Sequence, residues 1–424
     1  MILQLPFGTE TVRAEFRPPR RLVEVKAKRI ATLQKPEEIL SQALQKPIGC
    51  FPFEQIFRKA GKVVIVAPNN WHATGGRHYL PLLVKRLQEL SVPAGEISIL
   101  VAGAWGAKCN GIAGLFGAHG FEQEAPAVYY HDPFAAHALE YIGETRRGTP
   151  VFVNRLLVDA DHVILCGEAS HHSFWGYGGG PAMIVPECAG KETIERHLHL
   201  AYAGTPLELH PRCCDGAIAG NPLQEDLREA FRFLSSDFLL HTVLNENGQV
   251  VGAIAGEPLQ AHAAGCRLLD DIYRAPLGEA ADLVIASCGG HPHDENYARA
   301  HAALHRATRA VKPGGTIVFV AECRHGLGSD LAQWFRAPEK AGVEAKVFAR
   351  PQWENLLAIS TQQIARQYEV IAVTSLEAET VRALGFTPAA SFAEALQMAQ
   401  QKTAEINSCY LFHNSMSVVP QLQV

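Results

Sequence analysis

Histidine pairs lie beside glycine-rich turns in this sequence. His171 and His172 precede the glycines of 176–180, which only Tyr177 interrupts. Imidazole titrates near neutral pH and ligates metal ions, so such a pair is a candidate for proton transfer or ligation. Successive glycines let backbone N–H groups converge on an anion such as phosphate; the alternative is that one ring packs and the other is solvated. The stretch 171–190 contains no lysine or arginine, so an anion there would depend on backbone amides.

Two further histidine pairs and three tryptophans also fit a site. His197 and His199 lie two residues apart in a predicted helix and point to different faces, so at most one of them serves a given site. His291 and His293 share a loop that fits either a functional site or a proline turn with solvated side chains. The tryptophans fall in predicted loops, where they fit either an aromatic pocket wall or core packing: Trp71, Trp105 and Trp175.

Strands and helices alternate along the chain. Short β-branched runs bounded by turn residues predict strands at 61–67, 97–103, 126–131 and 161–167. An apolar stripe predicts a helix over 78–90, and Asn247-Gly248 predicts the turn of a hairpin over 242–256. The alternation restarts near Ala275, with strands at 282–290, 312–323, 343–349, 368–375 and 409–414. This order is typical of buried parallel sheets covered by helices.

We therefore predict the α/β class, with two doubly wound α/β domains flanking an interdomain cleft. The domains span 1–274, which carries the glycine loop 176–180, and 275–402, and residues 403–424 return to the first domain. Ligands of open parallel sheets bind beyond the carboxyl ends of the strands. The predicted strand-end loops lie at 68–77, 103–111, 167–180 and 288–296, so a ligand is expected in the cleft.

Composition narrows the functional class. The chain has 424 residues, enough for two domains, with 47% hydrophobic and 19% charged residues and a net charge of −5. These values favour a globular protein with a small-molecule substrate and argue against nucleic-acid binding. We recognise neither a leader peptide nor an apolar run long enough to span a membrane, and the ten cysteines lack a CxxC spacing. We expect a cytoplasmic protein with reduced thiols, and a homodimer remains open.

The sequence resembles the lactate racemase family. The segments that carry the resemblance occur in order along nearly the whole chain: 144–167, HHSFWGYGGGPAMIVP, GNPLQED, NENGQVVGAIAGEPLQAH, SCGGHPHDEN, VKPGGTIVFVAECRHGLG and HNSMSVVP. The resemblance implies two α/β domains and a nickel-pincer nucleotide as cofactor. It also implies hydride transfer at the α-carbon of a 2-hydroxy acid, with a histidine on each face moving the hydroxyl proton.

The family's catalytic positions are only partly matched. His172 matches one acid–base histidine, whereas Trp105 stands where its partner is expected. His72 stands at the place of the arginine that binds the substrate carboxylate, and Ala182 at that of the lysine that tethers the cofactor. Loss of one acid–base group typically lowers the rate about 10²- to 10⁴-fold, and histidine lacks the bidentate charged fork of arginine. Racemisation of lactate itself is therefore not expected.

The remaining expected roles concern the metal, the cofactor and the substrate. The nickel ligand is expected at His197 or His199, since imidazole suits nickel. Without the lysine, a nucleotide would be held noncovalently by His171, by Gly178, Gly179 and Gly180 beside Ala182, and by Lys108. The substrate pocket is expected to include Trp71, Arg77, His291, His293, Asn296 and Trp353.

Three hypotheses follow. The first is a divergent racemase, epimerase or hydride-transfer isomerase that acts on a 2-hydroxy acid or related compound other than lactate. The second is a zinc-dependent hydrolase or lyase on the same fold, with the metal held by His72, His172 and His291. The third is a non-catalytic relative that binds a nucleotide.

Overall fold

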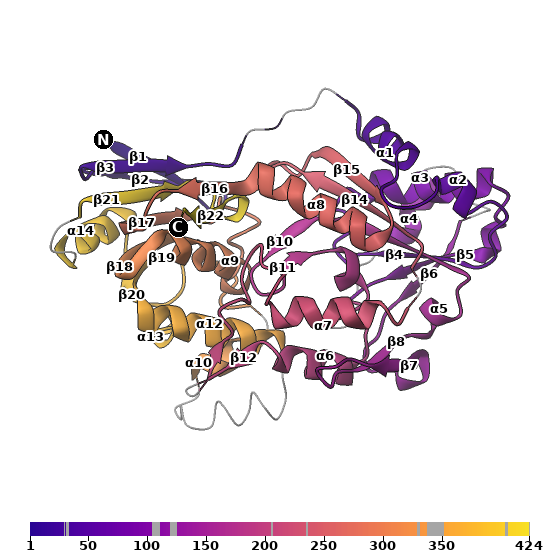
Figure 1. Ribbon diagram of the computed structural model, residues 1–424. Helices are drawn as coiled ribbons and strands as arrows, with labels where there is room; N and C mark the ends of the chain where they lie inside the picture. The colour runs from indigo at the N-terminus through magenta and orange to yellow at the C-terminus, as the bar shows by residue number, and fades with distance from the viewer. Residues whose placement is uncertain are drawn as a thin grey trace. The chain divides into compact units, whose positions relative to one another are not determined.

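The chain folds into two compact units, each an α/β domain with its own sheet. One unit comprises Met1–Lys28, Ala201–Pro211 and Ile272–Val424, and the other comprises Arg29–Leu200 and Arg212–Asp271. We call them the terminal unit and the central unit. The computed structural model (Figure 1) describes residues 1–28, 30, 34–103, 111–118, 125–204, 207–234, 236–328, 331–336, 352–402 and 406–423. The predicted α/β class and its parallel sheets are confirmed.

The central unit is built on a six-stranded sheet. Its strand order is β15 (Val250–Gly256), β14 (Phe238–Leu244), β9 (His162–Glu168), β4 (Val63–Ala67), β5 (Ile97–Val101) and β6 (Ala127–Tyr130). All neighbours are parallel except β14 and β15, which form the predicted hairpin. Residues Val63–Ala67 are all buried, which explains why β4 reads as a continuous apolar run.

Helices cover the central sheet. The described helices of this unit are α1 (Pro36–Gln45), α2 (Phe53–Ile56), α3 (Gly76–Glu89), α4 (Ile112–Ala118), α5 (Arg155–Val158), α6 (Lys191–His199), α7 (Pro222–Phe231) and most of α8 (Pro258–Tyr273). The predicted apolar stripe of α3 is buried, with Leu80, Leu83 and Leu87 packed against the core that contains Ile65 and Ile99. Two small antiparallel pairs complete the unit: β7 (Leu139–Glu144) with β8 (Pro150–Asn154), and β10 (Ser170–His172) with β11 (Gly176–Gly178).

The terminal unit has an all-parallel six-stranded sheet. Its order is β20 (Thr387–Ala389), β19 (Glu369–Val373), β18 (Val311–Val320), β17 (Ala281–Ser287), β21 (Ser408–Phe412) and β3 (Arg21–Val25). Its described helices are α9 (Tyr297–Ala307), α10 (Leu331–Arg336), α12 (Trp353–Gln367), α13 (Ala378–Ala383) and α14 (Phe392–Lys402). Short pairs add β1 (Ile2–Phe7) with β2 (Glu10–Glu15), β12 (Tyr202–Ala203) with β13 (Glu208–Leu209), and β16 (Arg274–Leu277) with β22 (Val419–Leu422). The predicted strand 343–349 lies outside the described residues.

Both ends of the chain belong to the terminal unit, which differs from the domains that we predicted. Residues 1–28, which we predicted in the first domain, lie in the terminal unit, and the end of the chain does not return to the first domain. The reason is strand pairing: β21 lies between β17 and β3 in the parallel sheet. Leu3 and Leu5 of β1 are buried in the same core as Leu283 and Leu411.

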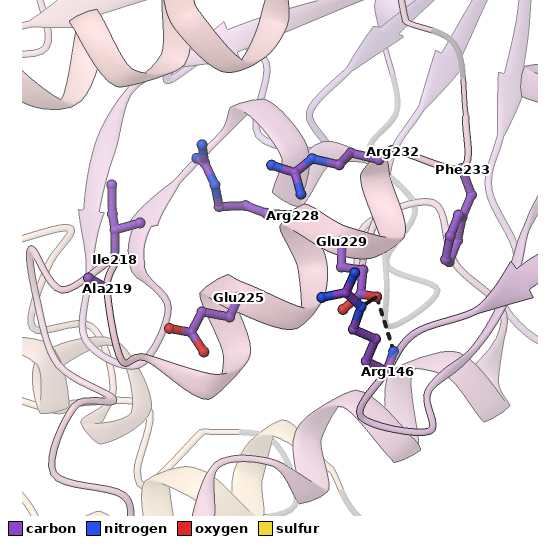
Figure 2. A pocket seen from close by; sticks show the side chains of 8 residues that line it. All are labelled: Arg146, Ile218, Ala219, Glu225, Arg228, Glu229, Arg232 and Phe233. Atoms are coloured by element: carbon purple, nitrogen blue, oxygen red, sulfur yellow. Dashed lines mark hydrogen bonds and ion pairs between the residues drawn. The ribbon is translucent and has the colours of Figure 1, made fainter.

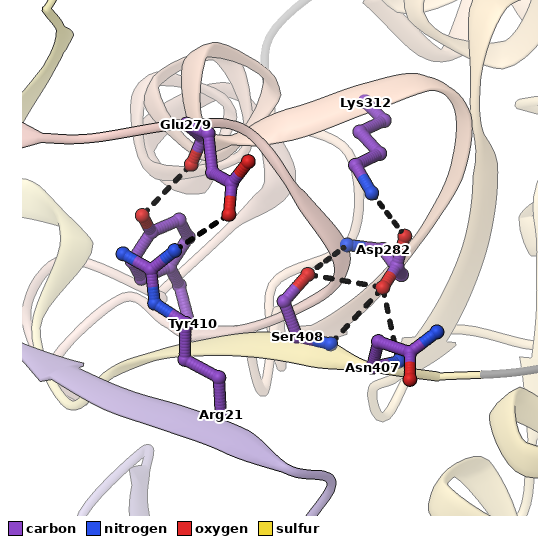
Figure 3. Close-up of polar contacts among 7 residues, drawn as sticks. All are labelled: Arg21, Glu279, Asp282, Lys312, Asn407, Ser408 and Tyr410. Atoms are coloured by element: carbon purple, nitrogen blue, oxygen red, sulfur yellow. Dashed lines mark hydrogen bonds and ion pairs between the residues drawn. The ribbon is translucent and has the colours of Figure 1, made fainter.

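Polar contacts also join these strands. The Asp282 carboxylate accepts hydrogen bonds from the Ser408 hydroxyl (3.0 Å), from the amides of Asn407 and Ser408 (3.0 Å each) and from Lys312 Nζ (2.6 Å) (Figure 3). Burial alone would raise the pKa of Asp282, but these donors lower it to about 2. The carboxylate therefore links β17, β18 and the start of β21.

Candidate active site

The carboxyl ends of β4, β9 and β14 meet at one edge of the central sheet, and hydrogen bonds join the segments that follow them. Thr242 Oγ1 on β14 donates to the carbonyl oxygens of Thr74 (2.7 Å) and Gly167 (3.1 Å). Thr74 belongs to the loop after β4, and Gly167 is the next-to-last residue of β9. Since β9 runs on into the hairpin of His171 and His172, this edge brings two of the predicted strand-end loops together.

His171 and His172 lie next to each other on β10, whose side chains alternate between the faces of the β10–β11 hairpin. The side chain of His171 is only 4% exposed, and its Nε2 lies 2.9 Å from Asp270 Oδ1. The Tyr177 hydroxyl donates to the same carboxylate at 2.8 Å. This network ties His171 to α8, so it anchors the hairpin, while its expected contact with a cofactor stays a prediction.

The ring of His172 is fixed by the turn that follows it. Its Nδ1 accepts hydrogen bonds from the backbone amides of Phe174 (3.2 Å) and Trp175 (3.3 Å), and the Trp175 ring contacts it edge-on. An Nδ1 that accepts must carry a lone pair, so the neutral ring holds its proton on Nε2. His172 is therefore positioned as a neutral hydrogen-bond donor.

The glycines of this segment allow close packing. Gly176, Gly179 and Gly180 have positive φ angles of 78°, 76° and 55°. A Cβ on Gly176 would lie 2.1 Å from the carbonyl oxygen of Ala217, and one on Gly179 would lie 2.4 Å from that of Glu168. Only glycine fits such contacts at positive φ. The packing of the segment thus accounts for these glycines without a phosphate, and their expected cofactor role stays a prediction.

Two buried histidines contact the backbone of the glycine segment 176–180. His241 Nε2 accepts the amide N–H of Gly180 at 3.1 Å, and His262 Nε2 lies 3.2 Å from the carbonyl oxygen of Gly178. Burial lowers the pKa of His262 to about 4 and that of His241 well below its ordinary value, so both rings are neutral. The amide of Gly180 is consequently already paired, and an anion would depend on other donors of this segment.

A buried chain of hydrogen bonds runs from Trp175 to α7. Trp175 Nε1 donates to His197 Nε2 at 2.7 Å, and His197 Nδ1 lies 2.8 Å from Asp226 Oδ2. Tryptophan can only donate, so His197 Nε2 accepts and the ring proton lies on Nδ1, facing the carboxylate. Asp226 also accepts from the hydroxyl groups of Thr145 (2.6 Å) and Thr149 (3.0 Å). Both nitrogens of His197 are engaged.

Trp71, His72 and Arg77 follow β4. Trp71 is 5% exposed, and its ring stacks on His72 at 3.7 Å between centroids. Its Nε1 is buried and has no hydrogen-bond partner among the described residues. His72 and Arg77 are exposed. An unpaired buried N–H group is costly, so Trp71 Nε1 is a donor available to a polar ligand.

Glu168 is a candidate that the sequence analysis missed. It is the last residue of β9, two residues before the hairpin, and it is half-buried. Burial raises the pKa of Glu168 to about 7, so the carboxyl group can gain or lose a proton near neutral pH. Its position directly after the predicted strand 161–167 could have identified it, but the prediction gave weight only to the histidine pair that follows.

The remaining expected pocket residues lie in the terminal unit. His291 is exposed, His293 is half-buried, and Trp353 begins α12. The side chain of Asn296 caps α9 by accepting the amide N–H of Arg299 at 3.0 Å. Its oxygen thus has a structural role, while a role of these residues in binding substrate stays a prediction.

Family models now identify the chain. Residues 7–207 match the lactate racemase N-terminal domain, and residues 278–420 match the lactate racemase C-terminal domain. The chain belongs to the lactate racemase family. Lactate racemase of Thermoanaerobacterium thermosaccharolyticum is 27% identical over 433 residues, which cover 98% of each chain. Lactate racemase of Lactiplantibacillus plantarum is 26% identical over 296 residues, 69% of this chain and 68% of that one.

Solved structures agree with the lactate racemase fold. The lactate racemase apoprotein of T. thermosaccharolyticum superposes with a TM-score of 0.86 at 24% identity, over 99% of this chain and all of that one. A Thermotoga maritima protein matches with a TM-score of 0.61 at 16% identity, over 91% of this chain and 98% of that one. At these identities the likeness establishes the fold alone.

The structure places some of the positions expected from the lactate racemase family. Ala182 is buried in the short helix Gly180–Met183, where its methyl group offers no amine for a tether. His199, the second possible nickel ligand, is half-buried at the end of α6. Trp105 and Lys108 lie outside the described residues.

Among the described residues, no group of three or more His, Cys, Asp or Glu side chains is arranged to hold a metal ion. None of the described helices combines the length and apolarity needed to cross a bilayer.

Proposed function

We propose that this protein is a racemase, epimerase or hydride-transfer isomerase that acts on a 2-hydroxy acid or related 2-hydroxy compound other than lactate. The observation that carries the proposal is the fixed ring of His172, whose Nδ1 accepts two backbone amides and whose Nε2 therefore holds the proton. A neutral imidazole N–H can polarise a carbonyl oxygen without being ionised itself. That carbonyl oxygen is the hydroxyl oxygen of the 2-hydroxy compound, after the α-carbon has lost hydride and the hydroxyl group has lost its proton. Glu168, whose pKa burial raises to about 7, is the candidate base for that proton.

The proposed substrate differs from lactate because the residues expected to bind a small carboxylate are changed. His72 stands where the family resemblance places an arginine, and it is exposed and stacked on Trp71. An imidazole lacks the two parallel N–H donors and the permanent charge with which arginine holds a carboxylate. A bulkier compound would gain affinity from contact with aromatic surface such as Trp71 instead.

The family resemblance implies the nickel-pincer nucleotide as cofactor, and the residues fit noncovalent binding. Ala182 excludes the tether, whereas the buried Trp71 Nε1 remains a donor without a partner among the described residues. His197 could ligate a metal through Nε2 only after Trp175 releases it, because Trp175 Nε1 donates to that atom. The cofactor, when bound, would supply the hydride acceptor. The protein would orient the substrate and hold a proton at His172 Nε2.

Cysteine chemistry supports a reducing compartment for this reaction. None of the nine described cysteines forms a disulfide bond. Free thiols persist in the cytoplasm, where disulfides are rare. We therefore propose the cytoplasm as the site of the activity.

The test uses protein prepared together with nickel and the pincer nucleotide, and enantiopure 2-hydroxy acids with side chains larger than methyl. We expect inversion, measured by chiral chromatography, and retention of deuterium from a 2-deuterated substrate, because hydride transfer returns the same hydrogen. His172→Gln should lower kcat about 10²- to 10⁴-fold. The exposed His137 gives the matched control, His137→Gln, which should keep full activity.

Two results would contradict this proposal. Full activity of His172→Gln would exclude the assigned role of that ring. Complete exchange of the α-deuterium with solvent would show proton abstraction from carbon in place of hydride transfer.

A further inference from the structure

A cavity of about 460 Å³ opens beside α7. Gln224 and Asp226 of this helix face inward, where they bond the Tyr177 carbonyl oxygen and His197. Glu225, Arg228, Glu229 and Arg232 line the cavity instead (Figure 2). Volumes of roughly 300–1,000 Å³ are typical of small-molecule sites.

The carboxylates of the cavity are already paired. Glu225 accepts from Arg147 Nη2 at 2.6 Å and from the amide of Gly220 at 2.7 Å. Glu229 accepts from the Arg146 amide at 3.1 Å, and its carboxylate lies 3.6 Å from Arg146 Nε. Arg146 and Arg147 therefore balance these two charges.

Arg228 and Arg232 have no such partner. No carboxylate or carbonyl group among the described residues accepts a hydrogen bond from either side chain, and Arg228 Nη1 is buried without a partner. Arg228 lies in α7 and Arg232 follows four residues later as the C-cap of this helix, and Figure 2 shows both side chains extending toward the same side of the view. Like charges at this spacing repel each other. Burial lowers the pKa of Arg228 and the neighbouring Arg232 charge adds to this, whereas Cys266 and the Glu257 carboxylate partly oppose it. Guanidinium nevertheless stays charged in proteins, so the pair lacks an anion.

We propose that this cavity binds the phosphate group of a small organic phosphate monoester. Two guanidinium groups match a phosphate dianion in charge and can donate paired N–H groups to its oxygens. The cavity exceeds the size of phosphate alone, and Ile218 and Phe233 offer apolar surface to the organic part. No residue of the His172 hairpin lines the cavity, and the inference does not depend on the proposed reaction.

Calorimetric titration tests this inference with glycerol 3-phosphate and inorganic phosphate as probes, and with sulfate, acetate and glycerol at equal ionic strength as comparisons. We expect wild type to bind glycerol 3-phosphate with a Kd on the order of 0.1 mM or tighter. Arg228→Gln and Arg232→Gln should each weaken it about tenfold or more, since each removes a charged donor pair. Phe233→Ala should weaken the monoester but leave inorganic phosphate unchanged.

The control is Arg155→Gln, which removes an exposed arginine of the same unit that does not line the cavity. It should leave every Kd unchanged. Arg232 is itself exposed, so Arg232→Gln is expected to fold as wild type does, and the melting temperature checks this. Equal binding of sulfate, acetate and the monoester would overturn the inference, as would an unchanged Kd in the folded Arg232→Gln variant.

Discussion

The proton of Glu168 couples the candidate site to stability. The folded pKa of this residue is about 7, whereas a carboxyl group in the unfolded chain titrates near 4.5. Between these values the folded state holds a proton that the unfolded state has lost. The free energy of unfolding therefore falls as pH rises from about 4.5 to 7, and stays lower above that.

Replacing the carboxyl group of Glu168 by an amide should remove this fall in the free energy of unfolding at higher pH. We expect Glu168→Gln to unfold with a free energy on the order of 2 kcal/mol above wild type at pH 8, and with no such gain at pH 4.5. Urea denaturation at both pH values measures the difference. The exposed Glu246 supplies the control, Glu246→Gln, which should show no pH-dependent gain. An equal effect of Glu168→Gln at both pH values would show that burial does not raise this pKa.

Asp226 is the buried acceptor on which several donors depend. His197 and the two threonine hydroxyl groups all reach this carboxylate, which is 0% exposed. Burial would raise its pKa, but the hydrogen bond from His197 and those from Thr145 and Thr149 lower it overall. An amide in its place would turn an N–H group toward donors that need an acceptor.

We expect Asp226→Asn to lower the free energy of unfolding by about 3–5 kcal/mol, the typical effect of breaking a buried charged network. Asp159→Asn is the matched control: Asp159 is exposed, so its change should stay within about 0.5 kcal/mol. Chemical denaturation of the three proteins gives the comparison. A loss below about 1 kcal/mol for Asp226→Asn would show that the network contributes little to stability.

At the scale of elements, the β10–β11 hairpin is held in place by glycine. Gly176 and Gly248 have nearly the same φ, 78° and 71°, but their surroundings differ. A Cβ on Gly176 would meet the Ala217 carbonyl oxygen at 2.1 Å, whereas a Cβ on Gly248 would meet nothing within 4 Å. The two positions therefore separate backbone strain from steric overlap.

Gly248→Ala should lower the free energy of unfolding by about 1–2 kcal/mol, the strain of a left-handed alanine. Gly176→Ala should lower it by at least about 2 kcal/mol more, because the hairpin must move away from Ala217. Thermal unfolding monitored by circular dichroism measures both changes. Equal losses would mean that the hairpin shifts freely, and the position of His172 would then not be fixed by this packing.

Many of the strands and turns could be predicted from the sequence. The strands β4, β9 and β17 are continuous apolar runs because both of their faces are covered, and Asn247-Gly248 marks the β14–β15 hairpin because its turn requires positive φ. The site was predicted less completely. His172 was found because a histidine pair precedes glycines, but the chain from Trp175 through His197 to Asp226 joins residues far apart in sequence. No local pattern reports such a contact, nor the burial that raises the pKa of Glu168.

At the scale of the whole molecule, the terminal unit depends on the first residues of the chain. Leu3 and Leu5 belong to its core, and β3 forms the edge of its sheet. Residues 1–28 were predicted in the other domain because the partner of β3 is β21, which lies far away in the sequence. A short strand carries no signal of which distant strand it joins.

A chain that begins at residue 34 should therefore keep a folded central unit and lose a stable terminal unit. Limited proteolysis followed by mass spectrometry should show fragments of the central unit that survive, while 272–424 is degraded faster than in the full chain. A full-length chain with Leu5→Ala should show the same trend more weakly, since it removes buried apolar volume without removing a strand. Equal protection of 272–424 in the truncated and full chains would refute the dependence.

The pairing of β3 with β21 also sets an order of events during synthesis on the ribosome. The sequence of the central unit is complete once Asp271 has been made, so this unit can fold while the rest is still being translated. The β3 segment is made before the central unit, yet its neighbour in the sheet, β21, is made after that unit is complete. During that interval the apolar residues of the first strands lack their final partners. The strands β1, β2 and β3 thus stay exposed to solvent or to chaperones while the whole central unit is synthesised, and a translational pause before β21 would lengthen that exposure.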